Sequence, residues 1–170
     1  MTEVRLQRWN DDDLATLQRS NTVEMTAYLG GPETPEALVR RHEKYLGEWR
    51  TGTARVFRIV VDGHPEGVGS IGYWPHEHHG EAAVETGWAV ESAYQGQGIA
   101  TAALRALVAE VRRHDTSVSI YAYPRVVNEA SNAICRKAGF ALLGTEAFEY
   151  PVGNVEESGV WVLRADSVSG

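Results

Sequence analysis

The chain has 170 residues, with 16 Lys or Arg, 23 Asp or Glu and one Cys, so its formal net charge is −7. This length predicts a single domain, spanning residues 1–170, that buries a core of its own. One cysteine excludes a disulfide framework, and an acidic chain without a basic cluster is a poor nucleic-acid binder. The sequence lacks a membrane-length apolar run and the apolar stretch of a signal peptide, so we expect a cytoplasmic protein with no membrane partner.

The first third of the chain predicts one strand followed by two helices. Residues 4–9 alternate between apolar and polar types, as a strand does. Asn10 then precedes three aspartates, and such a cap followed by acids suits the positive end of a helix dipole. Thr34 and Pro35 form a second helix start, because Pro is favoured at the first helical position. Apolar residues at helical spacing continue from there to Trp49.

The middle of the chain predicts three antiparallel strands. Residues 54–62 are rich in branched side chains and end in an Asp-Gly pair, which indicates a hairpin. The next two strands are expected at residues 67–74 and 82–90. Between them, residues 75–80 are expected to form a turn.

The second half predicts two further helices, each leading to strands. One helix begins near Gly98, and its apolar residues follow the i, i+3, i+4, i+7 spacing. The other is short, capped by Asn128 and closed at Gly139. Strands are expected at 117–123, 140–149 and 159–165. Residues 166–170 are expected to form a frayed tail. This order of elements predicts a mixed α/β fold with a largely antiparallel sheet.

The most informative stretch joins the strand that ends at Val90 to the helix that begins near Gly98. It reads Gln95-Gly96-Gln97-Gly98-Ile99-Ala100. Two glycines let backbone N–H groups approach an anion, and a helix N-terminus adds partial positive charge, so the stretch predicts a phosphate loop. A dinucleotide fingerprint would need a small residue where Thr101 stands, and a P-loop would need a lysine. A tight turn without a ligand is the alternative for this stretch alone.

A second motif, Asn128 followed by Ser131 and closed by Gly139-Phe140, lies downstream of the loop. Together the two motifs resemble the GNAT superfamily of N-acetyltransferases, and in particular its branch of ribosomal-protein N-terminal acetyltransferases. The resemblance covers roughly residues 66–142, while the N-terminal third agrees in element order only. It implies a central sheet of about six to seven strands, with splayed fourth and fifth strands, flanked by about four helices.

The resemblance also implies acetyl-CoA as the acetyl donor, and no metal. The pantetheine arm is expected between the splayed strands 82–90 and 117–123. The expected cofactor contacts are the backbone of Trp88, Ala89 and Val90 beside pantetheine, the amides of Gln95, Gly96, Gln97, Gly98, Ile99 and Ala100 at the pyrophosphate, and the side chains of Asn128, Ser131 and Asn132.

Glu85 is the expected general base. Many family members carry a catalytic Glu in this strand, and the strand period places Ala83, Glu85, Gly87 and Ala89 on one face. A carboxylate among small residues leaves room for an amine or a water. An amine with a pKa near ~10.4 must lose a proton before it attacks, which costs about 4–5 kcal/mol at neutral pH, and a carboxylate can take that proton. A structural Glu, paired with an arginine or exposed at a sheet edge, is the alternative.

The general acid is where the chain departs from the family pattern. Cys135 stands where many members carry a Tyr. A thiol with a pKa near ~8.5 can protonate a leaving thiolate, whereas an apolar Cys on a helix is commonly part of the core. Ser131 is the second candidate, because the ribosomal-protein branch often carries Ser there. Tyr121, Tyr123 and water remain open.

The densest cluster of titratable residues is His76, Glu77, His78 and His79. His and carboxylate ligands suit zinc, but a short turn has no strand or helix to fix the ligand geometry. We therefore expect a solvated turn, or a loop that contacts the substrate, rather than a metal site.

The predicted function is an acetyl-CoA-dependent N-acetyltransferase in which a primary amine attacks the thioester directly in a ternary complex. A small amine is the expected acceptor, because the sequence shows no added peptide-docking segment. The N-terminus of a protein or peptide is one alternative, and a non-catalytic acyl-CoA-binding module is another. Many family members form homodimers through late strands, and this is the one indication of assembly.

Overall fold

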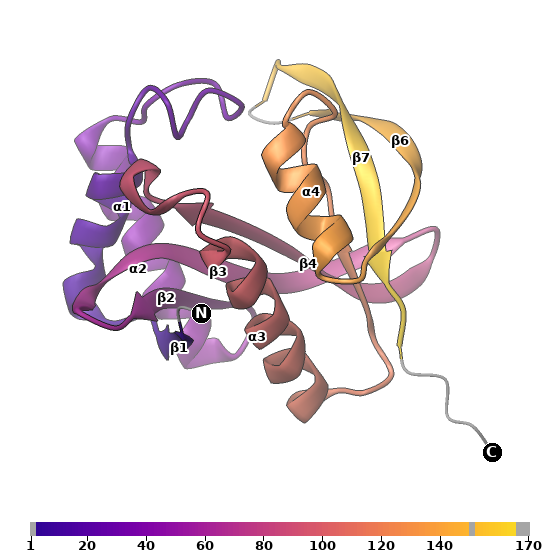
Figure 1. The fold of residues 1–170 in the computed structure, drawn as a ribbon, viewed down its shortest axis with the longest axis horizontal. Coiled ribbons are helices and arrows are strands. Elements are labelled where there is room, and N and C mark those ends of the chain that lie inside the picture. The colour runs from indigo at the N-terminus through magenta and orange to yellow at the C-terminus, as the bar shows by residue number, and fades with distance from the viewer. Residues whose placement is uncertain (1–2, 150–151, 166–170) are drawn as a thin grey trace.

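Four α-helices surround one seven-stranded sheet in a computed structural model, which describes residues 3–149 and 152–165 (Figure 1). The helices and strands in chain order are β1 (Val4–Arg8), a 3₁₀ turn (Asp11–Asp13), α1 (Leu14–Ser20), α2 (Pro35–Thr51), β2 (Arg55–Val61), β3 (His64–His78), β4 (Glu81–Val90), a second 3₁₀ turn (Ser92–Tyr94), α3 (Ile99–His114), β5 (Ser119–Ala122), α4 (Glu129–Lys137), β6 (Ala141–Glu149) and β7 (Val155–Leu163). The predicted mixed α/β class is confirmed.

The sheet is antiparallel except at its centre. Its strand order is β1-β2-β3-β4-β5-β7-β6, and β4 and β5 form the one parallel pair among the described strands. That pair consists of three residue pairs and ends at Glu85 and Tyr121. β4 continues to Val90 beside β3, while β5 ends at Ala122. The predicted splay of the fourth and fifth strands is therefore confirmed.

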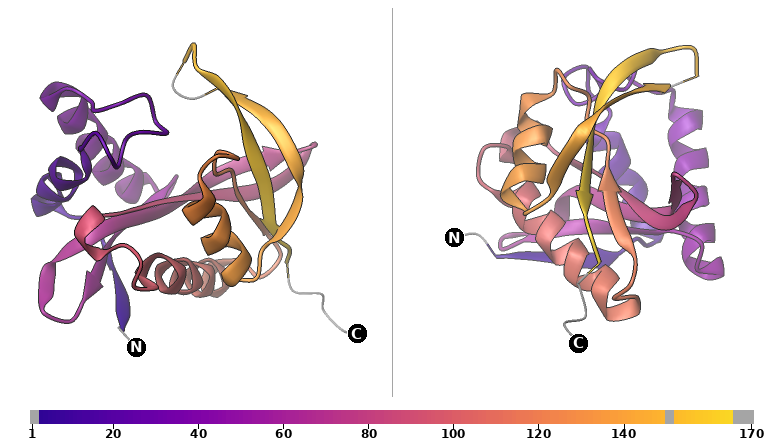
Figure 2. Two further views of the ribbon diagram at one scale, coloured as in Figure 1. Left: turned by 45° about the horizontal axis from the view of Figure 1, so that its top comes forward. Right: turned by 90° about the vertical axis from the view of Figure 1, so that its right-hand side faces the viewer.

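The two faces of the sheet carry different helices. α3 and α4 cover one face, where Leu104, Leu107 and Cys135 pack against Ile71 and Ile120 in the main core (Figure 2). α1 and α2 cover the other face toward β2, with a second cluster of buried side chains, Trp9, Leu17, Leu38 and Val56. Beyond β3, toward β4, β5 and β7, a third, small cluster of buried side chains consists of Ala83, Tyr121, Val160 and Val162.

Two predicted helix starts are confirmed by their caps. The Asn10 side chain accepts a hydrogen bond from the Asp12 backbone at 2.8 Å, and the Asp13 carboxylate accepts one from the Asn10 backbone at 2.8 Å. This capping box opens a 3₁₀ turn that continues into α1. Thr34 caps α2 by accepting from the Ala37 backbone at 3.2 Å.

The turn predicted at residues 75–80 is wrong. β3 continues to His78 and stays paired with β4 as far as the His78–Glu81 pair. His79 and Gly80 alone form the turn, with φ of 49° and 83°, as a two-residue hairpin requires. Pro75 suggested a break, but pairing with β2 ends at Tyr73. A residue without an N–H therefore removes no bond to β2.

No helix within residues 3–149 and 152–165 is both long and apolar enough to cross a bilayer. The predicted tail, residues 166–170, lies outside the described residues.

Candidate active site

The end of the β4–β5 pairing opens the sheet at Glu85. From Thr86 to Val90, β4 is hydrogen-bonded to β3 on one side and has no described strand on the other. Backbone N–H and C=O groups on that edge need partners. Trp88 and Ala89 are half-buried there. An extended ligand chain can pair with this edge as an added strand does, which fits the backbone contacts expected of Trp88, Ala89 and Val90.

The loop that follows β4 has the shape of an anion cradle. Gly96 and Gly98 have φ of 76° and 79°, and a Cβ added at either would meet no atom within 4 Å. α3 begins at Ile99, so its first amides have no acceptor within the helix, and the first turn carries no acidic residue. Open space on the glycine side and outward amides fit a phosphate group, so the residues present fit the expected cofactor.

Gln95 has a different local role from the other loop residues. Its side-chain amide donates to the Val90 carbonyl at 2.8 Å, which ties the loop to the end of β4. Gln97 and Ala100 lie on either side of the Gly98–Ile99 junction, and Gln97 is exposed. The loop thus presents backbone amides rather than charged side chains.

The start of α4 is held by two asparagines. Asn128 caps the helix by accepting from the Ser131 backbone at 3.2 Å. The Asn132 amide donates to the Arg125 carbonyl at 2.9 Å and to the Asn128 carbonyl at 2.7 Å, and its oxygen accepts from the Trp161 indole at 2.8 Å. Both side chains therefore make hydrogen bonds that stabilise the start of α4. Their expected contact with the cofactor stays a prediction. Ser131 is half-buried, one turn into the helix.

Glu85 is half-buried on the face that α3 and α4 do not cover. The Trp74 indole donates to its carboxylate, with Nε1–Oε2 2.6 Å. Burial raises the pKa of Glu85, and the bond from Trp74 partly offsets this. Gly87 makes room for that indole, since a Cβ there would lie 3.1 Å from the ring. None of the ion pairs in the described parts of the chain involves Glu85, so the arginine-paired alternative has no support.

The structure brings Tyr123, His76 and His78 together beside Glu85, a grouping that the sequence did not predict. The Tyr123 hydroxyl lies 2.6 Å from Nε2 of His76 and 3.3 Å from Nδ1 of His78. Burial, and then the charge of Glu85, raises the pKa of Tyr123, so the phenol stays protonated. Burial, followed by the proximity of His78, lowers the pKa of His76. The signal was the alternation of Trp74, His76 and His78, which places all three on one strand face.

Cys135 has no exposed surface and packs in the main core. Burial raises the pKa of its thiol to about 12. This placement matches the core alternative, because no substrate can reach the thiol without opening the packing between α3 and α4.

A cleft of about 440 Å³ adjoins this face on the far side of Tyr121. Its walls include His78 and His79 from the β3–β4 hairpin, Glu81 from β4, and Glu146 from β6. A second, smaller hollow of about 270 Å³ lies between the α1–α2 loop, at Tyr28, and β7, at Glu156.

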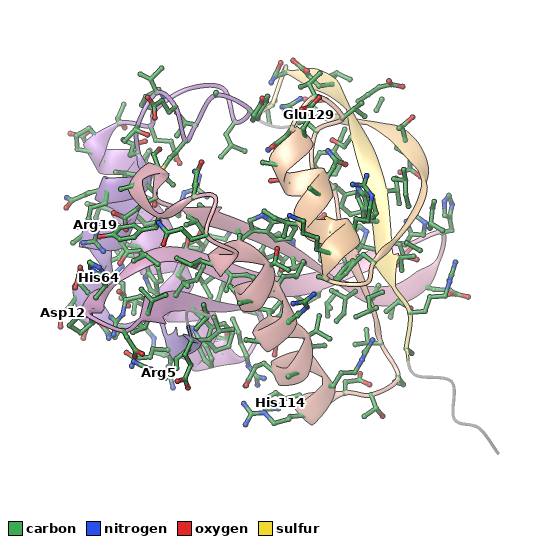
Figure 3. The ribbon with its side chains drawn as sticks, viewed as in Figure 1. Arg5, Asp12, Arg19, His64, His114 and Glu129 are labelled. Atoms are coloured by element: carbon green, nitrogen blue, oxygen red, sulfur yellow. The ribbon has the colours of Figure 1, made fainter. Side chains whose placement is uncertain are left out.

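Figure 3 locates Glu129 at the beginning of α4 and His114 at the end of α3.

Comparisons with known proteins match the chain to a family and to solved structures. Residues 3–141 match the family described as the acetyltransferase (GNAT) domain. No curated protein matches the chain.

Three solved structures share the fold over nearly the whole chain. The acetyltransferase of Salmonella typhimurium that modifies the N-terminal serine of the 50S ribosomal subunit protein L7/L12 has a TM-score of 0.78 and 22% identity, over 98% of this chain and 97% of that one. RimL, a ribosomal L7/L12 alpha-N-protein acetyltransferase, in complex with coenzyme A, has a TM-score of 0.76 and 20% identity, over 98% and 97%. The aminoglycoside acetyltransferase AAC(6')-Ib in complex with coenzyme A has a TM-score of 0.76 and 20% identity, over 95% of each chain.

Proposed function

Because the chain belongs to the acetyltransferase (GNAT) family and is an N-acetyltransferase, we propose that it uses acetyl-CoA to acetylate a small primary amine. The observation that carries this proposal is the position of Glu85. Its carboxylate is oriented by Trp74 at the point where the sheet opens, on the face with the 440 Å³ cleft.

In the proposed reaction, the pyrophosphate of acetyl-CoA is bound by the amides of the 95–100 loop and the start of α3. The pantetheine arm pairs with the open edge of β4, beside Trp88, Ala89 and Val90. The thioester then lies near the end of the β4–β5 pairing. A backbone N–H on the same edge stabilises the oxyanion that forms when the amine attacks.

Glu85 is the proposed base and takes the proton of the acceptor ammonium, directly or through a water. Its raised pKa makes it a better proton acceptor than an exposed carboxylate. The proton returned to the leaving thiolate comes from Tyr123 or Ser131 in this proposal, because Cys135 is enclosed in the core. Tyr123 is neutral and lies close to Glu85. Its raised pKa makes it a weaker acid than an exposed tyrosine, which leaves Ser131 as the second proposed donor.

A small amine is the proposed acceptor because of the size and lining of the cleft. Its volume is that of a small-molecule site. The two carboxylates in its lining, Glu81 and Glu146, outnumber the one arginine, Arg164. Tyr121 adds an aromatic wall, and together these groups suit a cation. The N-terminus of a protein or peptide is the second candidate, supported by the likeness to the L7/L12-modifying enzymes. A homodimer through the late strands stays a prediction.

The test is release of free thiol from acetyl-CoA across a panel of amines. The panel holds a polyamine, an aminoglycoside, amino-acid amides, and peptides that begin with Ser or Ala. Turnover with a small cationic amine and none with the peptides supports the proposal. Turnover with peptides alone would show that the acceptor is a peptide N-terminus and not a small amine. Acetyl-CoA binding without turnover on any amine restores the binding-module alternative.

A further inference from the structure

The tip of the β3–β4 hairpin brings two imidazoles and one carboxylate together. His78 is the last residue of β3, His79 is the first residue of the turn, and Glu146 lies on β6. One ligand-type atom from each of the three residues lies within 4.8 Å of the other two. The histidines and Glu146 are far apart in the sequence, and three strands separate β3 from β6 in the sheet. No local sequence pattern therefore indicated that these residues lie together.

We propose that His78, His79 and Glu146 bind a divalent cation of the zinc class and thereby join the β3–β4 hairpin to β6. Two imidazoles and a carboxylate are a ligand set that zinc accepts, with a fourth position left for water or another small ligand. The sequence argued against a metal because an isolated turn cannot fix ligands. In the structure two of the three residues lie on strands, His78 on β3 and Glu146 on β6, so the ligand set does not depend on an isolated turn.

The backbone at His79 supports the site. Among the described residues other than glycine, His79 alone has a positive φ, at 49°. Asn or Gly usually occupies such a turn position. The left-handed conformation allows the His79 ring to lie 4.2 Å from the His78 ring, although neighbours along a strand point to opposite faces.

A hydrogen bond also orients His78. Nδ1 of His78 lies 3.3 Å from the Tyr123 hydroxyl, and its ring stacks on Tyr121 at 4.3 Å. Metal-binding histidines commonly use one ring nitrogen for such a bond, which fixes the ring and leaves the other nitrogen for the metal. Nε2 of His78 is the nitrogen left for coordination.

The three ligand atoms, now separated by up to 4.8 Å, must move closer by at most about 1.5 Å. Nε2 of His79 lies 3.7 Å from a Glu146 oxygen. Ligand atoms around a tetrahedral zinc are separated by about 3.3 Å. The side chains of His79 and Glu146 are 77% and 49% exposed, so they can close this difference by rotation without disturbing the core.

The experiment measures Zn²⁺ binding by calorimetry to the full chain without an affinity tag. Coenzyme A is left out, because its thiol binds zinc. His79→Asn keeps a residue that tolerates the turn, and Glu146→Gln keeps the size of the side chain. Each should weaken Zn²⁺ binding at least tenfold. The control is His114→Gln, which removes a different His–Glu pair, His114 with Glu110, at the end of α3 and far from the hairpin (Figure 3).

Two further readouts sharpen the test. Zn²⁺ should raise the melting temperature of the parent chain and the His114→Gln variant, but not that of the two ligand variants. Co²⁺ in place of Zn²⁺ should give visible absorption bands that Glu146→Gln loses. Absence of saturable binding, or equal affinity in the parent chain and both ligand variants, overturns the proposal. The three ligands also line the 440 Å³ cleft of the proposed acceptor site. Neither readout involves acetyl transfer, so the zinc proposal can fail while the proposed function stands, and the reverse also holds.

Discussion

The indole of Trp74 donates a hydrogen bond to the carboxylate of Glu85, with 2.6 Å between Nε1 and Oε2, across the β3–β4 pair. The bond fixes one carboxylate oxygen at the point where β4 and β5 separate. Because it favours the charged form while burial disfavours it, Glu85 combines a raised pKa with a fixed orientation.

Replacing Glu85 by Gln should lower kcat by about 10²–10⁴-fold, because the amide cannot take the proton of the acceptor. The amide oxygen still accepts the bond from Trp74, so the site should keep its shape. Thiol release measures turnover, and calorimetry should show little change in acetyl-CoA affinity. Near-normal turnover at neutral pH would remove Glu85 as the base.

The same variant should differ from the parent chain in stability in a pH-dependent way. The folded-state pKa of Glu85 is raised, so folding favours the protonated carboxyl, and stability is lost as pH rises through that pKa. Gln cannot ionise. Its melting temperature relative to the parent chain should therefore be higher at neutral pH than in acidic buffer. A difference that is independent of pH would contradict the burial of this carboxylate.

Trp74→Phe should move the acidic limb of the pH–rate profile to higher pH. The change removes a hydrogen bond that favours the carboxylate form and leaves the burial that raises its pKa. The profile of kcat/KM reports the free enzyme. An unchanged limb, with lower turnover at every pH, would instead indicate that Trp74 acts only in packing.

Gly98→Gln should weaken acetyl-CoA binding by about tenfold or more, because the side chain would occupy the space beside the loop amides. Gly52→Gln is the matched control. Gly52 has φ of 73° at the end of α2, and a Cβ there also meets no atom within 4 Å. Both changes carry about 1–2 kcal/mol of backbone strain. Equal affinity in the two variants would refute the loop assignment.

Cys135→Ala should leave turnover within about twofold and lower the stability by roughly 1–2 kcal/mol, as expected for a small cavity in the core. Thermal unfolding measures the stability, and thiol release from acetyl-CoA measures turnover. A thiol whose pKa is raised to about 12 should also react slowly with thiol reagents in the native protein. A large loss of kcat with normal stability would indicate that Cys135 takes part in the reaction.

Features that depend on neighbouring residues were predictable from the sequence. The helix starts at Asn10 and Thr34 depend on hydrogen bonds within three residues, and the loop glycines adopt the positive φ that their type allows. The β4–β5 splay came from family resemblance, because no local pattern indicates which strands lie side by side.

Features that depend on distant partners were missed. The Tyr123–His76 bond joins residues 47 positions apart, and the Asn132–Trp161 bond joins residues 29 apart. The end of β3 was misjudged because a proline disfavours a strand in general, whereas pairing with β2 has already ended when β3 reaches Pro75. Only the pairing of the strands shows that a proline at position 75 removes no hydrogen bond to β2.

Arg125 links three segments that are remote in sequence. It lies between β5 and α4, its side chain donates to the Tyr28 carbonyl at 2.6 Å, and it forms an ion pair with Glu156 of β7 at 3.5 Å. Any outward swing of the α1–α2 loop must therefore break the Arg125–Tyr28 bond or pull on the start of α4. The α1–α2 loop, the start of α4 and β7 are thus mechanically coupled through one side chain.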